Sequence, residues 1–263
     1  MQDDEFRSVQ TDAQQNIYVL GLTNSYQSIT TVQRDLIVMK FDSTLQSVWT
    51  RTMVTSDDTY GGFGGSLTVA DNGEFYIAGN IREDSVVFSS GTIQQNPGFW
   101  TVSFVSKYNS SGTEQWAIPV GGSISGLLIY SSQDIYISGV ADPTYNIGNA
   151  TPTGTIFLAR YSNSGNFNNV VFSSLHSSCP IYPSIPLKGS TGEIYLSSTI
   201  RDSLTFGNLV FHNTTPTPGS CPLADAVLVK YQPDVTAGIN SLNRENDQNN
   251  FVIYPNPNNG QFN

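Results

Sequence analysis

The chain has 263 residues, of which 38% are hydrophobic, 11% are aromatic and only 12% are charged, and its formal net charge is −10. A surface so poor in Lys and Arg argues against a nucleic-acid partner and against binding to an anionic membrane. No run of about 18 apolar residues is present to span a bilayer, and the acidic first residues do not resemble a signal peptide.

One short pattern recurs four times along the chain, at intervals of about 60 residues. Its copies begin at residues 16, 74, 134 and 193, and each carries a tyrosine, namely Tyr18, Tyr76, Tyr136 and Tyr195. Similarity at a fixed period of this length is typical of repeat proteins. We therefore expect four structural repeats.

The first repeat contains four short segments that are candidates for strands, at residues 7–11, 16–21, 35–41 and 46–52. Apolar and polar residues tend to alternate in them, and alternation with period two is typical of a half-buried strand. The third segment ends in Lys40-Phe41, and the fourth contains Trp49.

The second repeat follows the same order, with strands predicted at 66–70, 74–79, 101–108 and 114–118. Residues 71–73 and 109–112 are predicted turns, because Asn and Gly tolerate positive φ. A long polar loop is expected between the second and third strands, and the glycine-rich residues 61–65 are expected to connect repeats flexibly. Lys107-Tyr108 and Trp116 match Lys40-Phe41 and Trp49.

The third repeat runs from Leu127 to about Phe172, with its third strand ending at Arg160-Tyr161 and a turn at 163–165. Phe172 is the candidate for the tryptophan position. The fourth repeat has predicted strands near 184–188, 193–198 and 226–231, and its fourth strand is expected to be missing or degraded. No segment has a helical period, so the predicted fold class is all-β.

Four-stranded units of this size are typical of the blades of a β-propeller. We expect antiparallel blades at about residues 1–54, 55–120, 121–174 and 175–232. The recurring Tyr, Lys-aromatic and Trp positions are expected to fill the wedge between blades, with each Lys or Arg head group in water. An aromatic binding platform is the less favoured interpretation. Four repeats could close as a small propeller, but an arc of a six- to eight-bladed ring is preferred.

Two segments carry a resemblance to a known family over about residues 1–232. They are Asp71-Asn72-Gly73-Glu74-Phe75-Tyr76-Ile77-Ala78-Gly79 and Val105-Ser106-Lys107-Tyr108-Asn109-Ser110-Ser111-Gly112. They resemble the bacterial SBBP-type β-propeller repeats. The resemblance implies a propeller fold and an extracellular protein.

A polar segment at 233–250 is a predicted flexible linker. Residues 251–263 resemble the start of a type IX secretion C-terminal sorting domain, whose hallmark residues here are Tyr254, Pro255, Asn256, Pro257, Gly260 and Phe262. The resemblance implies recognition by the type IX secretion machinery and a secreted or outer-surface location. The abrupt ends suggest a fragment cut at both sides, which would also account for the missing signal peptide.

The Cys and His residues all lie late in the chain, at His176, Cys179, His212 and Cys221. An even cysteine count in an exported protein favours a Cys179–Cys221 disulfide. A zinc site and unpaired cysteines are the alternatives, although the spacings match no usual zinc motif.

No catalytic motif is recognisable, and no cofactor or metal is predicted. A glycosidase pair (Glu83 with Asp84, or Asp202 with Glu193) and a weak calcium site at Asp57-Asp58 are the less favoured alternatives. We expect a non-catalytic secreted or cell-surface scaffold that binds a polysaccharide or a protein. The competing hypothesis is a propeller appendage of an extracellular hydrolase. The aromatic residues predicted for a binding loop face are Tyr60, Phe63, Phe99, Trp100 and Tyr145.

Overall fold

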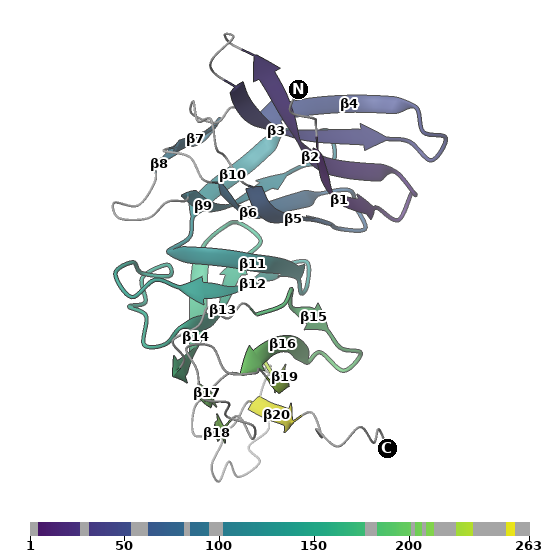
Figure 1. Ribbon diagram of the computed structural model, residues 1–263. Coiled ribbons are helices and arrows are strands. Elements are labelled where there is room, and N and C mark those ends of the chain that lie inside the picture. The colour runs from purple at the N-terminus through teal and green to yellow at the C-terminus, as the bar shows by residue number, and fades with distance from the viewer. Residues whose placement is uncertain are drawn as a thin grey trace.

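The computed structural model describes residues 5–26, 32–53, 63–81, 85–94, 102–176, 183–200, 203–206, 209–212, 225–233 and 251–255. These residues form β-strands joined by turns and contain no helix, which confirms the all-β prediction (Figure 1). Consequently, no helix in the described part has the length and apolarity needed to cross a membrane.

Most strands belong to four antiparallel sheets that follow the repeats. Sheet 1 consists of β1 (Glu5–Thr11), β2 (Ile17–Tyr26), β3 (Val32–Phe41) and β4 (Ser47–Met53). Sheet 2 consists of β5 (Phe63–Val69), β6 (Phe75–Ile81), β9 (Val102–Tyr108) and β10 (Glu114–Pro119). In both sheets each strand pairs with the next one of its set, so the topology is a meander.

Sheets 3 and 4 repeat this meander. Sheet 3 consists of β11 (Gly122–Ile129), β12 (Asp134–Ala141), β13 (Ile156–Ser162) and β14 (Phe167–His176), extended by β17 (Ser203–Phe206) and β18 (Leu209–His212). Sheet 4 consists of β15 (Leu187–Lys188), β16 (Ile194–Ile200), β19 (Asp225–Tyr231) and β20 (Phe251–Pro255). The strands of all four predicted repeats are therefore present.

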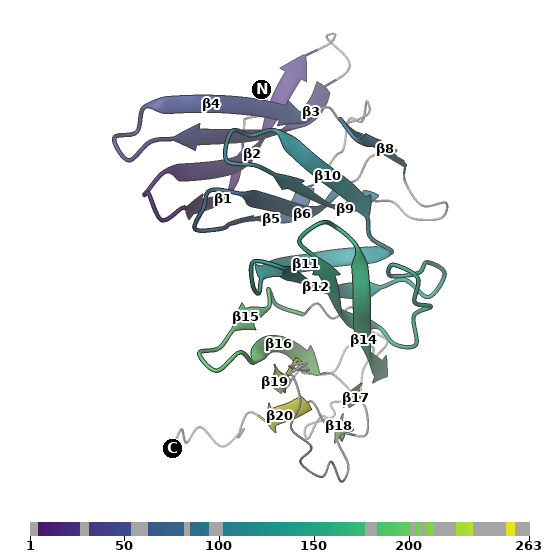
Figure 2. The same cartoon turned by 180° about the vertical axis from the view of Figure 1, so that it is seen from behind.

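The four sheets stack in chain order, from sheet 1 at one end to sheet 4 at the other (Figures 1 and 2). The first strands of the first three sheets lie side by side, because β5 contacts both β1 and β11. The stack is open in the described residues, with sheets 1 and 4 at opposite ends. The structure thus supports repeated four-stranded sheets without showing a closed ring.

The two faces of a sheet pack against different neighbouring sheets. We call the face that carries Tyr18, Tyr76, Tyr136 or Tyr195 the docking face, and the opposite one the receiving face. In the first contact, Tyr18 and Leu20 of sheet 1 pack with Phe75 and Ile77 of sheet 2, and all four are buried. Burying an apolar side chain of this size contributes about 1.5–3 kcal/mol, so these faces hold the stack together.

Two short hairpins occur where the sequence suggested loops or gave no strand. The segment after Gly79 contains β7 (Ser85–Phe88) and β8 (Gly91–Gln94) instead of a purely polar loop. Val86, Phe88 and Ile93 of this hairpin are buried in the core shared by sheets 1 and 2. The corresponding hairpin of the fourth repeat, β17–β18, pairs with β14 of sheet 3. Both hairpins therefore connect an even-numbered repeat to the sheet before it.

The last sheet is not short of a strand. Its fourth strand, expected to be missing or degraded, is supplied by β20, which pairs with β19 from Tyr231↔Phe251 to Val227↔Pro255. The residues at the start of the predicted sorting domain therefore form the edge of sheet 4. A terminal proline suits an edge strand, because proline cannot donate a hydrogen bond to a further strand.

Two local predictions are wrong. Lys40 pairs with Trp49 and Lys107 with Trp116, whereas Arg160 pairs with Asn169, so Asn169 and not Phe172 occupies the tryptophan position of sheet 3. The same register shift occurs at this point in all three sheets, so the equivalent position lies at a constant distance after the turn and holds a polar residue in sheet 3. Residues 63–65, predicted as part of a flexible connection, belong to β5.

Candidate functional site

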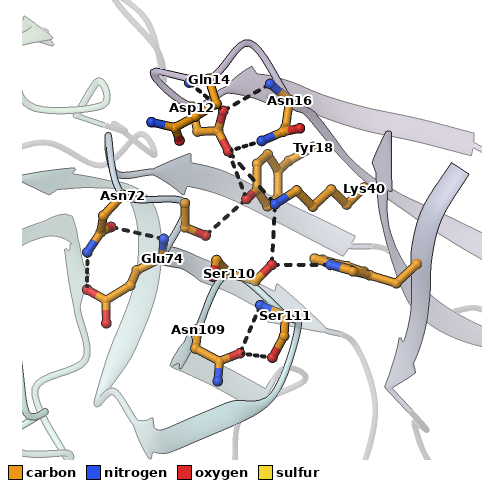
Figure 3. Close-up of polar contacts among 12 residues, drawn as sticks. Asp12, Gln14, Asn16, Tyr18, Lys40, Asn72, Glu74, Asn109, Ser110 and Ser111 are labelled. Carbon is orange, nitrogen blue, oxygen red and sulfur yellow. Dashed lines mark hydrogen bonds and ion pairs between the residues drawn. The ribbon is translucent and has the colours of Figure 1, made fainter. Parts of the chain in front are cut away.

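The recurring Tyr, Lys and Trp side chains of sheet 1 bind the turns of sheet 2 (Figure 3). Tyr18 Oη donates a hydrogen bond of 3.1 Å to the Gly73 carbonyl in the β5–β6 turn. Trp49 Nε1 and Lys40 Nζ both donate to the Ser110 carbonyl in the β9–β10 turn, at 3.2 and 3.4 Å. The three side chains therefore fix the orientation of sheet 2, as expected for residues that pack between repeats. The prediction that the lysine head groups remain in water is wrong, because Lys40 and Lys107 are only 8% and 7% exposed and their ammonium groups are held by the turns and by carboxylates.

Asp12, at the start of the β1–β2 turn, holds Tyr18 and Lys40 of this cluster through its carboxylate. Its carboxylate accepts hydrogen bonds from the Asn16 side chain and backbone and from Tyr18 Oη, and Lys40 Nζ lies 3.9 Å away. Burial raises the pKa of Asp12, but these hydrogen bonds and the Lys40 charge outweigh it, so the pKa lies below its ordinary value. Asp12 is therefore ionised at neutral pH and holds Tyr18 in place.

The same contact recurs between sheets 2 and 3. Tyr76 Oη donates to Asn163 Oδ1, and Trp116 Nε1 donates to the Asn163 carbonyl at 3.0 Å. Lys107 Nζ lies 3.0 Å from Glu74 Oε1 and 5.7 Å from the centre of the Tyr76 ring. A single residue of the β13–β14 turn thus receives both aromatic donors.

Sheet 3 meets sheet 4 through a variant of this contact. Arg160 makes a two-point ion pair with Asp134, at 3.0 and 2.8 Å. Tyr130 Oη, at the end of β11, donates to the Gly192 carbonyl of the β15–β16 turn at 2.7 Å. Gly192 occupies the place that Gly73 has in sheet 2, so another tyrosine performs the task of Tyr18. The interpretation as packing residues accounts for these positions without a ligand.

A separate cavity of about 340 Å³ lies beside Tyr145, the one predicted binding aromatic whose side chain is described. The loop between β12 and β13 contributes Tyr145 and Asn146, β10 contributes Ile118 and Pro119, and sheet 3 contributes Tyr161 and Phe167. The cavity therefore combines aromatic walls with a few polar groups, which is typical of sites for small ligands.

Backbone hydrogen bonds and two glycines preform this cavity. The loop is closed by reciprocal bonds between Ile147 and Ala150, at 3.0 and 3.1 Å. A Cβ atom on Gly121 would lie 2.2 Å from the Asn146 carbonyl oxygen, and one on Gly148 would lie 2.2 Å from the Phe167 ring. Only glycine therefore allows the loop to approach so closely.

Tyr161 lies in the cavity wall and is almost completely buried. Only 2% of its surface is exposed, and no described residue forms a hydrogen bond with its hydroxyl, which is closed off from solvent. Burial raises the pKa of Tyr161 to about 12, so the hydroxyl is neutral at physiological pH. Tyr161 therefore contributes to the cavity wall through its ring, while the buried hydroxyl destabilises the fold by about 1–3 kcal/mol.

The other sequence candidates are described only in part or not at all. Phe63, expected in a connection, is the first residue of β5, and Tyr254 and Pro255 end β20, but nothing of these side chains is described. His176 and His212 both pair with Ser203, in neighbouring strands of sheet 3. The remaining candidates lie outside the described residues, namely Tyr60, Phe99, Trp100, Cys179, Cys221, Asn256, Pro257, Gly260 and Phe262.

The described residues contain no group of three or more His, Cys, Asp or Glu side chains that could hold a metal ion. Of the suggested carboxylate pairs, only Glu193 is described, since Glu83, Asp84 and Asp202, together with Asp57 and Asp58, lie outside the described part. Hydrogen bonds from Thr191 and Tyr195 lower the pKa of Glu193 to about 2, whereas a general acid requires a raised pKa. Glu193 therefore orders the β15–β16 turn.

Comparison with the models of known protein families and with curated proteins finds no match to this chain.

Proposed function

We propose that the four sheets are consecutive blades of a β-propeller that serves as a non-catalytic, extracellular binding scaffold. Four meanders stacked face to face, with the first strands of the first three sheets side by side, support the propeller. The recurring Tyr, Lys and Trp residues serve packing, and the cavity beside Tyr145, with its aromatic walls, is the site that we propose for a ligand.

That cavity is the observation on which the binding role rests. Its lining residues carry no charged side chain, so a neutral ligand suits it better than a charged one. The rings of Tyr145, Tyr161 and Phe167 offer apolar surface, and the exposed Asn146 offers hydrogen bonds. The volume of about 340 Å³ lies at the lower end for small-ligand sites. A sugar unit of a neutral polysaccharide has this combination of apolar faces and hydroxyl groups.

Calorimetric titration with a panel of neutral oligosaccharides tests this role. We expect one or more of them to bind, and Tyr145→Ala to weaken binding at least tenfold, which corresponds to about 1.4 kcal/mol. Val87→Ala is the matched control, because Val87 is half-exposed on the β7–β8 hairpin, away from the lining residues. Absence of binding, or equal affinity of Tyr145→Ala and the unmodified chain, would refute the sugar site.

The proposed location rests on the sequence motif of the last residues. We propose export by the type IX route, since Tyr254-Pro255-Asn256-Pro257 is followed by Gly260 and Phe262. Asn256 and Pro257 lie beyond β20, so replacing both with Ala leaves the strand residues unchanged. In a bacterial host that has this route, the double variant should remain in the periplasm, while the unmodified chain reaches the surface or the medium. Equal export of both would contradict the proposal.

The disulfide between Cys179 and Cys221 also stays a proposal, supported by the even cysteine count of an exported protein. Thiol alkylation followed by intact mass measurement tests it. No labelling before reduction and labelling of two thiols after reduction is the expected result, and labelling without reductant would contradict it.

A further inference from the structure

Within the chain, the docking faces of sheets 1, 2 and 3 pack against the receiving faces of sheets 2, 3 and 4. Two faces remain without a described neighbour, namely the receiving face of sheet 1 and the docking face of sheet 4. On the receiving faces of sheets 2, 3 and 4, the residues equivalent to Val19 are Ile77, Ile137 and Leu196, each at most 2% exposed. In sheet 1 no described element covers this face. Val19 and its neighbours there are half-exposed.

The uncovered receiving face of sheet 1 is as apolar as its buried counterparts. Phe6 and Val9 of β1 pair with Gly21 and Val19, so they share this face, and they are 70% and 62% exposed. Val9 corresponds to Leu67 of sheet 2, which is 2% exposed. An apolar sheet face that is buried in three copies and open in the fourth is the mark of an interaction surface.

Sheet 4 presents the complementary face at the other end of the stack. Leu228 is 39% exposed, whereas its equivalents Val38, Val105 and Leu158 are at most 2% exposed. Lys230 Nζ lies 5.9 Å from the centre of the Tyr195 ring. The same pairing of lysine and tyrosine, at 4.9 Å for Lys40 and Tyr18, binds the turns of sheet 2. Lys230 and Tyr195 therefore lie on the docking face of sheet 4 in the arrangement that Lys40 and Tyr18 have on sheet 1.

The β3–β4 turn of sheet 1 carries a larger residue than the equivalent turns of sheets 2 and 3. At the left-handed position of the β3–β4 turn, sheet 1 has Leu45 with φ 67°, where sheets 2 and 3 have Gly112 and Gly165. Those glycines make room for a tryptophan, since a Cβ on Gly165 would lie 3.0 Å from the Trp116 ring.

The tryptophan position of sheet 4 holds a smaller residue. Lys230 pairs with Val252, as Lys40 pairs with Trp49. Leu45 is larger than the glycines of the other turns, and Val252 is smaller than the tryptophans of the other sheets. The summed side-chain volume of turn and docking residue therefore stays roughly the same. Leu45 is 68% exposed at this left-handed position, so its side chain is accessible to a docking sheet.

We propose that the docking face of sheet 4 binds the receiving face of sheet 1 in a second copy of this chain, head to tail. The second copy is favoured over the same chain because sheets 1 and 4 lie at opposite ends of the stack (Figure 1). Tyr195 then packs against the β1–β2 turn, and Lys230 meets the β3–β4 turn, where Asp42 adds a negative charge. Two copies of four sheets give eight, which is within the range of closed propellers.

Sedimentation velocity over a range of concentrations tests the interface with the full chain. We expect the unmodified chain to form dimers or larger species, and Val9→Glu and Leu228→Glu each to weaken association at least tenfold. An equimolar mixture of the two variants should recover dimers, because one intact face of each kind remains. Val87→Glu is the matched control, since Val87 is 49% exposed on neither face and should associate like the unmodified chain.

Two results would overturn the proposal. One is a chain that remains monomeric at every concentration. The other is a Leu228→Glu variant that associates as well as the unmodified chain, since that outcome indicates pairing of two copies of sheet 1. Thermal melting of all three variants checks folding, and midpoints of Val9→Glu and Leu228→Glu close to that of Val87→Glu assign any loss of association to the interface.

Discussion

Replacing Gly165 with Ala tests whether the tryptophan of one sheet packs against the turn of the next. Gly165 has φ +83°, and its substitution is strained by about 1–2 kcal/mol whatever surrounds it. The new Cβ would also lie 3.0 Å from Cδ2 and 3.2 Å from Cε2 of Trp116. Displacing the ring weakens the hydrogen bond from Trp116 Nε1 to the Asn163 carbonyl, which contributes about 0.5–1.5 kcal/mol.

The total loss expected for Gly165→Ala is therefore about 2–3 kcal/mol, or a fall in melting temperature of roughly 5–10 °C. The backbone strain alone is tolerable at this turn position, because sheet 1 has Leu45 there. A double-mutant cycle in urea unfolding separates the two effects. In the Trp116→Ala background, Gly165→Ala should destabilise the chain by only the strain, about 1 kcal/mol less than in the unmodified chain. Equal losses in both backgrounds would refute the packing of Trp116 on this turn.

Three further predictions concern individual residues. Leu45→Gly should raise the free energy of unfolding by about 1 kcal/mol, because it removes a strained φ, and urea unfolding measures this. The same substitution should weaken self-association, as followed by sedimentation, and stronger association would contradict the interface. The pKa of Glu193 falls from its ordinary 4.5 to about 2 on folding, so the stability it contributes is complete above pH 4.5 and is lost as the pH falls toward 2. Glu193→Gln should therefore lose less stability than the unmodified chain between pH 4.5 and 2, as followed by thermal melts, and parallel losses would argue against this role. Tyr161→Phe should raise the free energy of unfolding by about 1 kcal/mol, since no described residue pairs with its buried hydroxyl. Urea unfolding measures this, and a loss of stability would show that the hydroxyl has a partner.

The repeats were predictable because each strand alternates apolar and polar residues and each tight turn uses Asn or Gly. The turn at 109–112, for example, ends with Gly112 at φ +77°, as its sequence requires. Local patterns of this kind are visible in a single sequence, so the first three meanders and the packing role of Tyr18, Tyr76 and the two tryptophans could be foreseen.

Features that depend on distant pairing were not predictable. β20 follows the predicted polar linker at 233–250 and pairs with β19, which precedes it. The residues of β20 alone do not indicate which strand it pairs with. The β7–β8 and β17–β18 hairpins have strands of four residues, too short for a clear alternation, although both begin with a shared Asp-Ser-x-x-Phe pattern at residues 84–88 and 202–206.

The sequence indicated Tyr145 as an aromatic residue of a connection, but it did not predict a cavity there. Tyr161 follows Arg160 at the end of a predicted strand, where the sequence indicated a packing residue, and it is indeed buried. That no described residue pairs with its hydroxyl could not be predicted, because hydrogen-bond partners across sheets cannot be read from local spacing.

Negative-stain electron microscopy of the unmodified chain, at a concentration where it associates, tests the central claim most directly. The account predicts rings of eight blades around a central opening, formed by two chains joined head to tail. Compact rings from a single chain would contradict the contact between copies, and isolated open stacks at every concentration would contradict both that contact and the closed propeller.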